Sequence, residues 1–117
     1  MIEVVIPHLS ANMTDDLCNQ LLLYLRNNIK NIILNLKEVK SMDDEAAEKL
    51  VRTQQKFYDE NASFVFCELN KEIENILDQS NLLELMNVTP TESEAADIVQ
   101  MEEIEREILN EDDTFSS

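Results

Sequence analysis

Short apolar runs alternate with helical segments along this chain, and this alternation constrains its fold more than any other feature of the sequence. The main runs lie at Ile2–Ile6, Asn31–Leu36 and Ser63–Leu69, and each has the length of one strand. Their residues are largely apolar in succession, which is typical of strands buried on both faces of a sheet. The pattern predicts an α/β fold, in which a mostly parallel or mixed sheet of about four strands is covered by about four helices.

Helical segments are predicted where apolar residues recur every three or four positions. They are a helix capped by Thr14, a helix over about Asp43–Tyr58, a helix capped by Asn70, a short turn of helix at Asn81–Met86, and a last helix from Thr91 to about Leu109. The last helix begins with a capping box, because Thr91 is followed three residues later by Glu94. Asn87–Thr89 is predicted to be a brief edge strand, since Pro90 has no N–H to donate to a ladder.

The chain contains no glycine. This excludes the phosphate-binding loops and the nucleophile elbow that depend on glycine. Tight turns must instead use Asn, Asp and Ser, which tolerate a left-handed backbone better than most residues do. Such turns are predicted at Asn27-Asn28, Asp59-Glu60-Asn61 and Ser80-Asn81.

The net charge of −16 limits the partners that the protein can have. Nucleic acid and anionic membrane surfaces are poor partners, because their phosphates repel an acidic protein. A basic protein surface is the natural complement. Residues 102–113 alone hold seven acidic side chains and one basic side chain, Arg106, and are interpreted as a solvated helix face with an acidic tail.

A chain of 117 residues is expected to form one domain. Its apolar runs are shorter than the roughly 20 residues that span a bilayer, and no basic leader precedes the first run. We therefore expect a cytoplasmic protein. Cys18 and Cys67 lie far apart within apolar patterns and are predicted to be buried, reduced thiols. No cofactor is predicted.

The apolar run Ile32–Leu36 is followed by a short loop and by Asp43-Asp44-Glu45-Ala46 at the start of a helix. This junction resembles the switch site of the STAS family, the anti-sigma-factor antagonist fold, in which Asp-Ser-x-Gly occupies the same place. The segment Val88–Ala96, preceded by the leucine-rich turn Leu82–Leu85, is similar to the family's closing strand and helix. The resemblance implies a non-enzymatic regulatory module that binds a protein partner, such as an anti-sigma-type ATPase or kinase.

In that family the serine of the switch site is phosphorylated by a partner kinase, and phosphorylation releases the partner. Here the resemblance places Asp44 at the serine position, where phosphorylation of a serine is impossible. The implied partner surface comprises Ser41, Asp43, Asp44, Glu45 and Glu48. A simpler alternative remains open: Ser41 or Asp43 caps the helix, and the acids that follow lie favourably in its first turn. Ser41 is also a candidate for a displaced phosphoacceptor.

The resemblance covers nearly all of residues 2–100, so we expect a STAS-like domain at 1–100 and, at 101–117, an extension of the last helix with an acidic, frayed tail. The family usually begins with a strand for which this chain has no room before Val4. The sheet is therefore expected to have an open edge, which invites pairing with another chain. We hypothesise a homodimer, or a partner strand, at that edge.

Three other functions compete with this hypothesis. The first is a structural or scaffold subunit that recruits a basic partner through its acidic surface. The second is a receiver-like phosphoacceptor, which fits poorly because Pro7-His8 follows the first strand where an acid pair is needed. The third is a small enzyme with Asp43 and Asp44 as acid–base groups, or with the two acids binding a divalent cation. His8 is interpreted as structural, because no Cys or other His accompanies it.

Overall fold

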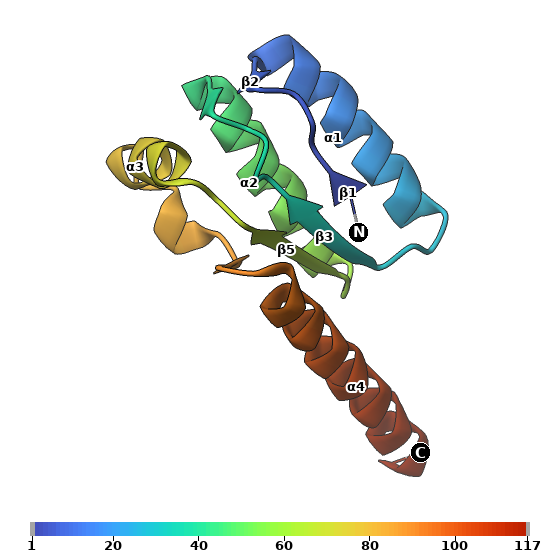
Figure 1. The fold of residues 1–117 in the computed structure, drawn as a ribbon. Coiled ribbons are helices and arrows are strands. Elements are labelled where there is room, and N and C mark those ends of the chain that lie inside the picture. Colours follow the sequence, from blue (N-terminus) through green and yellow to red (C-terminus); the bar gives the residue numbers. More distant parts are fainter. Residues whose placement is uncertain (1, 117) are drawn as a thin grey trace.

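Four strands form the central sheet of the protein, in the order β1-β3-β5-β6 (Figure 1). They are β1 (Ile2–Glu3), β3 (Asn31–Asn35), β5 (Ser63–Cys67) and β6 (Val88–Thr89), and each neighbouring pair is parallel. The computed structural model describes the backbone of residues 2–116 and the side chains of residues 2–109. The α/β fold and the sheet of about four strands are therefore confirmed, and β6 is the edge strand that Pro90 predicted.

The first predicted strand is shorter than expected. Regular pairing in β1 ends at Glu3, although the Val4 N–H still donates to the Asn35 carbonyl at 3.0 Å. Beyond Pro7 the chain forms a second, two-residue strand, β2 (His8–Leu9), which pairs in parallel with β4 (Ser41–Met42). The Pro7 carbonyl accepts from the Lys40 N–H at 2.8 Å. This small second sheet brings the end of the first strand beside the loop that precedes the second helix.

Helices cover both faces of the central sheet (Figure 1). On one face α1 (Ala11–Arg26) packs against α2 (Asp44–Asp59), and α3 (Lys71–Gln79) lies near the carboxyl ends of the strands. A 3-10 turn, η1 (Leu83–Leu85), leads from α3 to β6, and α4 (Glu92–Ser116) covers the other face. The α2 boundaries agree with the predicted Asp43–Tyr58 to within one residue.

The predicted start of α1 is wrong. Ser10 caps this helix, and its hydroxyl oxygen accepts from the Met13 N–H at 3.3 Å. Thr14 lies inside the helix, where its buried hydroxyl donates to the Ser10 carbonyl at 2.7 Å. The helix therefore begins four residues earlier than predicted, with Ser10 in the N-cap position and Thr14 bonded back to it.

The predicted caps at Asn70 and Thr91 are confirmed. The Asn70 side-chain oxygen accepts from the Ile73 N–H at 3.0 Å, and the Thr91 hydroxyl oxygen accepts from the Glu94 N–H at 3.2 Å. The backbone of α4 is helical to Ser116, which is farther than the predicted end near Leu109. The predicted fraying of Asn110–Ser117 concerns residues that lie outside the described side chains.

The core is divided by the alternation of side chains along β5. Phe64 and Phe66 face α1 and α2, and Phe64 packs against both Phe57 and Phe66 with ring centroids 5.1 Å apart. Val65 and Cys67 face α4 and pack with Ala95 and Val99 in a smaller cluster. Because β5 is buried on both faces, its unbroken apolar sequence is accounted for.

Asparagine takes the positions where glycine would be expected. Asn28, Asn61 and Asn81 have φ angles of 64°, 59° and 59°, which confirms a left-handed residue in each of the three predicted turns. Glu68, immediately after β5, also has a positive φ of 57°. That position was not predicted, and glutamate has no side-chain feature that favours it.

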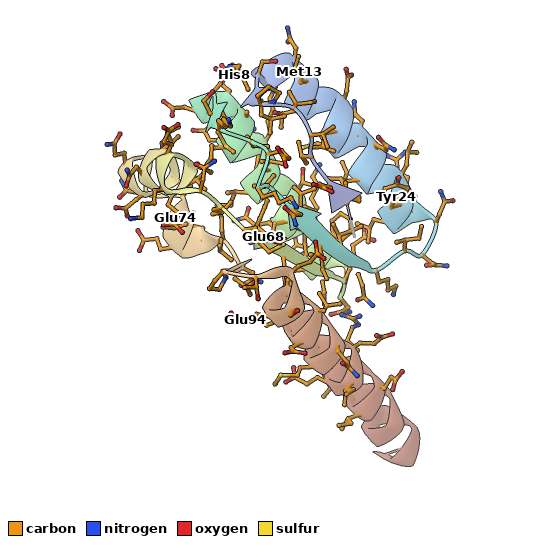
Figure 2. All side chains as sticks on the ribbon, in the orientation of Figure 1. His8, Met13, Tyr24, Glu68, Glu74 and Glu94 are labelled. Carbon is orange, nitrogen blue, oxygen red and sulfur yellow. The ribbon has the colours of Figure 1, made fainter. Side chains whose placement is uncertain are left out.

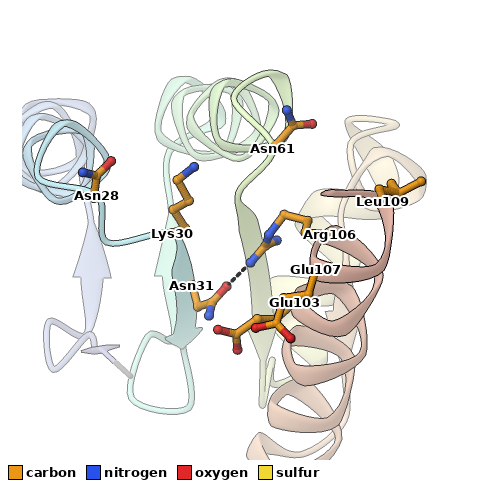
Figure 3. A pocket seen from close by; sticks show the side chains of 8 residues that line it. All are labelled: Asn28, Lys30, Asn31, Asn61, Glu103, Arg106, Glu107 and Leu109. Carbon is orange, nitrogen blue, oxygen red and sulfur yellow. Dashed lines mark hydrogen bonds between the residues drawn. The ribbon is translucent and has the colours of Figure 1, made fainter. Parts of the chain in front are cut away.

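Two side chains tie α4 to the rest of the domain. The Tyr58 hydroxyl donates to the Glu102 carboxylate at 2.9 Å, so Glu102 is not simply part of a solvated face. Arg106 donates to the Ser63 hydroxyl and to the Asn31 side-chain oxygen, both at 2.8 Å. Arg106 also lines an open hollow of about 560 Å³ between α4 and the amino ends of the strands (Figure 3).

Candidate functional site

The loop before α2 is held in place by the small β2–β4 sheet. The Asp43 N–H donates to the Leu9 carbonyl at 3.1 Å, directly after the paired residues of β2 and β4. Asp43 then takes the N-cap position of α2, with its carbonyl accepting from the Ala47 N–H at 3.1 Å. The five residues that the sequence indicated therefore lie at one junction, with Ser41 in β4 and the other four at the cap or in the first turns of α2. We call Ser41, Asp43, Asp44, Glu45 and Glu48 the acidic surface.

Asp43 does not cap its own helix with its side chain. One carboxylate oxygen accepts from the Ala11 N–H at 3.2 Å, at the start of α1, and the other lies 3.3 Å from His8 Nε2. A carboxylate at this place is favourable because the amino ends of helices carry partial positive charge. The expectation that Ser41 or Asp43 caps α2 is correct only for the backbone position of Asp43, since Ser41 belongs to β4.

His8 has partners that its sequence neighbours did not indicate. Its Nδ1 lies 2.7 Å from the Ser41 hydroxyl oxygen, and its Nε2 contacts Asp43. The pairing of β2 with β4 places His8 directly opposite Ser41. Sequence reasoning missed this trio because its members lie 33 and 35 positions apart. Only a prediction that Pro7 starts a second strand could have found it.

Ser41, His8 and Asp43 contact one another in the order hydroxyl, imidazole, carboxylate that is typical of a catalytic triad. The trio is nevertheless exposed to solvent. The side chains of His8 and Asp43 are 55% and 47% exposed. Nucleophilic catalysis depends on preorganised groups in a site that excludes water, which an exposed trio does not provide. What the trio does is hold the Ser41 hydroxyl in a defined orientation at the end of β4.

The other carboxylates of the acidic surface are open to solvent. Asp44 is exposed and accepts from the hydroxyl of Ser80, the C-cap of α3, at 3.3 Å. Glu45 is exposed, and Glu48 forms a long, exposed contact with Arg52 at 3.7 Å. Such an exposed pair neutralises little of the charge. The start of α2 thus presents several carboxylates to solvent, which suits a cationic partner.

Asp43 and Asp44 are not brought together as ligands for one cation. Asp43 is directed to His8 and Ala11, whereas Asp44 is directed to Ser80. The nearby Lys49 is bound to Asp15 of α1 at 2.7 Å, so it links the two helices and leaves these two acids unneutralised.

Both thiols are free and buried, as predicted. Burial is the main cause that raises the pKa of Cys18. Burial, followed by the charges of Glu68 and Glu92, raises the pKa of Cys67 to about 11. Neither thiol is therefore an activated nucleophile at neutral pH.

Among the described residues, no helix combines the length and the apolar character that crossing a membrane requires.

Comparison with known proteins identifies the fold family. A sequence model of the STAS domain matches residues 5–95, which is most of the chain. Among curated proteins, none matches the sequence.

Several solved structures share the fold. A candidate anti-sigma factor antagonist from Thermotoga maritima superposes with a TM-score of 0.74 at 20% identity, over 84% of this chain and 86% of that one. An anti-sigma-factor antagonist (STAS) domain protein from Planctomyces limnophilus gives 0.69 at 17% identity, over 80% and 84% of the two chains. The Bacillus cell-fate determinant SpoIIAA, in its phosphorylated form, gives 0.61 at 15% identity, over 83% and 86%. Because the sequence identities are only 15–20%, the structural similarity establishes the fold alone.

Proposed function

The chain belongs to the STAS domain family, and from that membership we propose that it is a non-enzymatic regulatory module that binds a protein partner through the acidic surface. The observation that carries the proposal is the exposure of Asp43, Asp44 and Glu45 at the start of α2. These residues occupy the junction at which the family resemblance locates the switch. They are held there by the β2–β4 sheet rather than by a flexible loop.

Asp44 acts in this proposal as a permanent charge at the switch position. A carboxylate carries one negative charge, whereas phosphoserine carries about 1.5 to 2 and offers three acceptor oxygens. One of the similar structures, SpoIIAA, was determined in a phosphorylated form, which supports phosphorylation as a modification found on this fold. Asp44 would imitate part of that charge without a kinase. Partner binding by this protein would then be constitutive, or directed to a different partner.

The partner is expected to present a basic surface. The net charge of −16 and the exposed carboxylates favour Lys- or Arg-rich protein surfaces and disfavour nucleic acid. By resemblance to the family, an anti-sigma-type ATPase or kinase, or another signalling component, is the class of partner to look for. Such a partner implies that the protein works in the cytoplasm.

The proposal is tested by capture of partners from native lysate with wild type and two charge-reversed variants. Asp44→Lys reverses the charge at the start of α2, and Glu60→Lys makes the same change at the exposed far end of that helix. An exposed ion pair contributes up to about 1 kcal/mol, and repulsion of similar size follows reversal, so binding should weaken by about 2 kcal/mol, or near thirtyfold. The partner should be lost with Asp44→Lys and kept with Glu60→Lys. Equal retention by both variants would rule out the acidic surface.

A second candidate function is favoured by one contact, the 2.7 Å approach of His8 Nδ1 to the Ser41 hydroxyl. Ser41 could be a displaced phosphoacceptor whose hydroxyl is oriented by the imidazole. In that case a peptide containing Ser41, isolated from the native source, carries phosphate, and Ser41→Ala abolishes the modification. If the peptide carries no phosphate both when the partner is bound and after it is released, Ser41 is not a phosphoacceptor. Asp44 then remains the candidate for the charge at the switch position.

A further inference from the structure

Three side chains from two segments that are distant in sequence meet at the carboxyl end of β5. The Cys67 sulfur and one carboxylate oxygen each from Glu68 and Glu92 all lie within 4.8 Å of one another. Cys67 is the last residue of β5 and Glu92 is the first residue of α4. Figure 2 shows Glu68 between the end of the sheet and the start of α4. The cluster belongs neither to the acidic surface nor to the hollow beside Arg106.

The thiol of Cys67 is the part of this cluster that lacks a partner. Cys67 is completely buried, on the face of β5 that α4 covers. Its sulfur has no hydrogen-bond partner among the described residues, although it lies next to two carboxylates. Burial and these two charges raise the pKa of Cys67 to about 11, so the thiol keeps its proton while no cation is nearby. The Cys67 sulfur is therefore a buried group within 4.8 Å of two carboxylate oxygens, and it has no hydrogen-bond partner among the described residues.

The two carboxylates share a single hydrogen-bond donor. The Asn35 side-chain nitrogen donates to Glu68 and to Glu92, at 2.9 Å in each case. The Asn35 side-chain oxygen accepts from the Lys37 N–H at 3.0 Å, which fixes the orientation of the amide. Among the described residues, neither carboxylate forms an ion pair with Lys or Arg. Two negative charges are therefore held close together beside a thiol, and a cation between them would remove this repulsion.

We propose that Cys67, Glu68 and Glu92 form a binding site for a divalent transition-metal ion of the Zn²⁺ class. Zn²⁺ and Co²⁺ accept thiolate together with carboxylate ligands, at about 2.3 Å for sulfur and 2.0–2.2 Å for oxygen. Mg²⁺ and Ca²⁺ prefer oxygen ligands alone, so the thiol selects against them. The separations of the three ligand atoms are close enough that small side-chain rotations would bring all three onto one ion. Asn35 would act as a positioning residue that holds both carboxylates.

Binding involves proton displacement and no change of oxidation state. The ion forms a bond to the Cys67 sulfur while the S–H bond breaks, and the proton is released to solvent. Glu68 and Glu92 contribute one oxygen each, and a fourth position remains for water or for a side chain of a partner. The ion would join the end of β5 to the start of α4. This role is independent of partner binding at the acidic surface.

The test is a titration of the untagged, metal-free, full-length protein with Co²⁺, followed by absorption. A thiolate-to-cobalt charge-transfer band should appear and saturate at one ion per chain, with release of one proton per ion, and Zn²⁺ should abolish the band. Cys67→Ser should remove the band, whereas Cys18→Ser, the matched change at the other buried thiol, should retain it. Asn35→Ser should weaken binding about ten- to a hundredfold.

Two further variants, Glu92→Gln and Glu94→Gln, test the proposal even if Cys67→Ser does not fold. Glu92→Gln should weaken Co²⁺ binding at least tenfold, as expected for a change at or next to a metal ligand. Glu94→Gln, an exposed position in the same helical turn, should leave binding within about twofold. Absence of a charge-transfer band at saturating Co²⁺ would overturn the proposal. So would equal weakening by Glu92→Gln and Glu94→Gln, which would indicate diffuse attraction to an acidic helix.

Discussion

The contact between Tyr58 and Glu102 makes the attachment of α4 sensitive to alkaline pH. The Tyr58 hydroxyl donates to Glu102 at 2.9 Å and accepts from the Asn87 side-chain nitrogen at 2.6 Å. Burial, and then the hydrogen bond to Glu102, raise the pKa of Tyr58 to about 12 from its usual value of 10.0. The folded protein therefore holds this proton more tightly than the unfolded chain does. We expect Tyr58→Phe to lose the stability that comes from this difference.

The size of the effect follows from the pKa difference. A shift of about two units corresponds to about 2.7 kcal/mol, and because Tyr58 is only partly buried we reduce this to about 1–1.5 kcal/mol. Between about pH 10 and pH 12 the unfolded chain loses the proton first and so binds fewer protons than the folded protein. Stability must then fall as the pH rises through this range. The contribution is complete below about pH 10 and is absent by about pH 12.

The measurement is urea unfolding of wild type and Tyr58→Phe at several values from about pH 8 to pH 11, with Tyr24→Phe as the control. Tyr24 lies on α1, away from α4 (Figure 2), and its hydroxyl accepts a hydrogen bond from the Gln20 side-chain nitrogen. Wild type should be more stable than Tyr58→Phe by about 1–1.5 kcal/mol near pH 8, and this advantage should shrink above about pH 10. A difference near zero at pH 8, or one that does not change with pH, would mean that the Tyr58 proton does not stabilise the folded protein.

Three further predictions concern caps, backbone strain and the sheet edge. Ser10→Ala should reduce the free energy of unfolding in urea by about 1 kcal/mol. As the control, Ser93→Ala at an exposed position should change it by less than about 0.5 kcal/mol. Equal effects of the two substitutions would mean that Ser10 is not the cap. Glu68→Asn should stabilise the metal-free protein by about 0.5–1 kcal/mol, because Asn adopts a positive φ more readily; a loss of stability in the same assay would contradict this. Sedimentation equilibrium should detect a dimer formed through the outer edge of β1. Glu3→Pro should give a monomer, because the Val4 N–H donates to β3 while the Glu3 N–H faces the outer edge. A strictly monomeric wild type would exclude the open-edge hypothesis.

Local patterns carried most of the fold. The order of strands and helices, the cap at Asn70, the box at Thr91 and the left-handed turns at Asn28, Asn61 and Asn81 each depend on a few neighbouring residues. Such features are readable from sequence because the physics that produces them is local. The error at Thr14 has the same origin, since Ser10 and Thr14 are both good capping residues and only the packing of α1 chooses between them.

The chemistry at the candidate sites depends on residues that are distant in sequence, and there the prediction from sequence was incomplete. His8 meets Ser41 only because the chain forms β2 directly after Pro7 and this strand pairs with β4. Cys67 meets Glu92 only because α4 begins at the carboxyl end of β5. The acidic start of α2 was predicted because all its members lie in one short segment. What each carboxylate contacts required the three-dimensional arrangement.

Binding of a protein partner at the acidic surface can be mapped residue by residue with an NMR footprint. The captured partner, unlabelled, is added to ¹⁵N-labelled protein, and the perturbed backbone amides are mapped onto the structure. We expect the largest perturbations at residues 41–48 and at His8, which contacts Ser41 and Asp43. Perturbations confined to residues 102–109 of α4, with residues 41–48 unchanged, would contradict it and would identify the acidic last helix as the binding element.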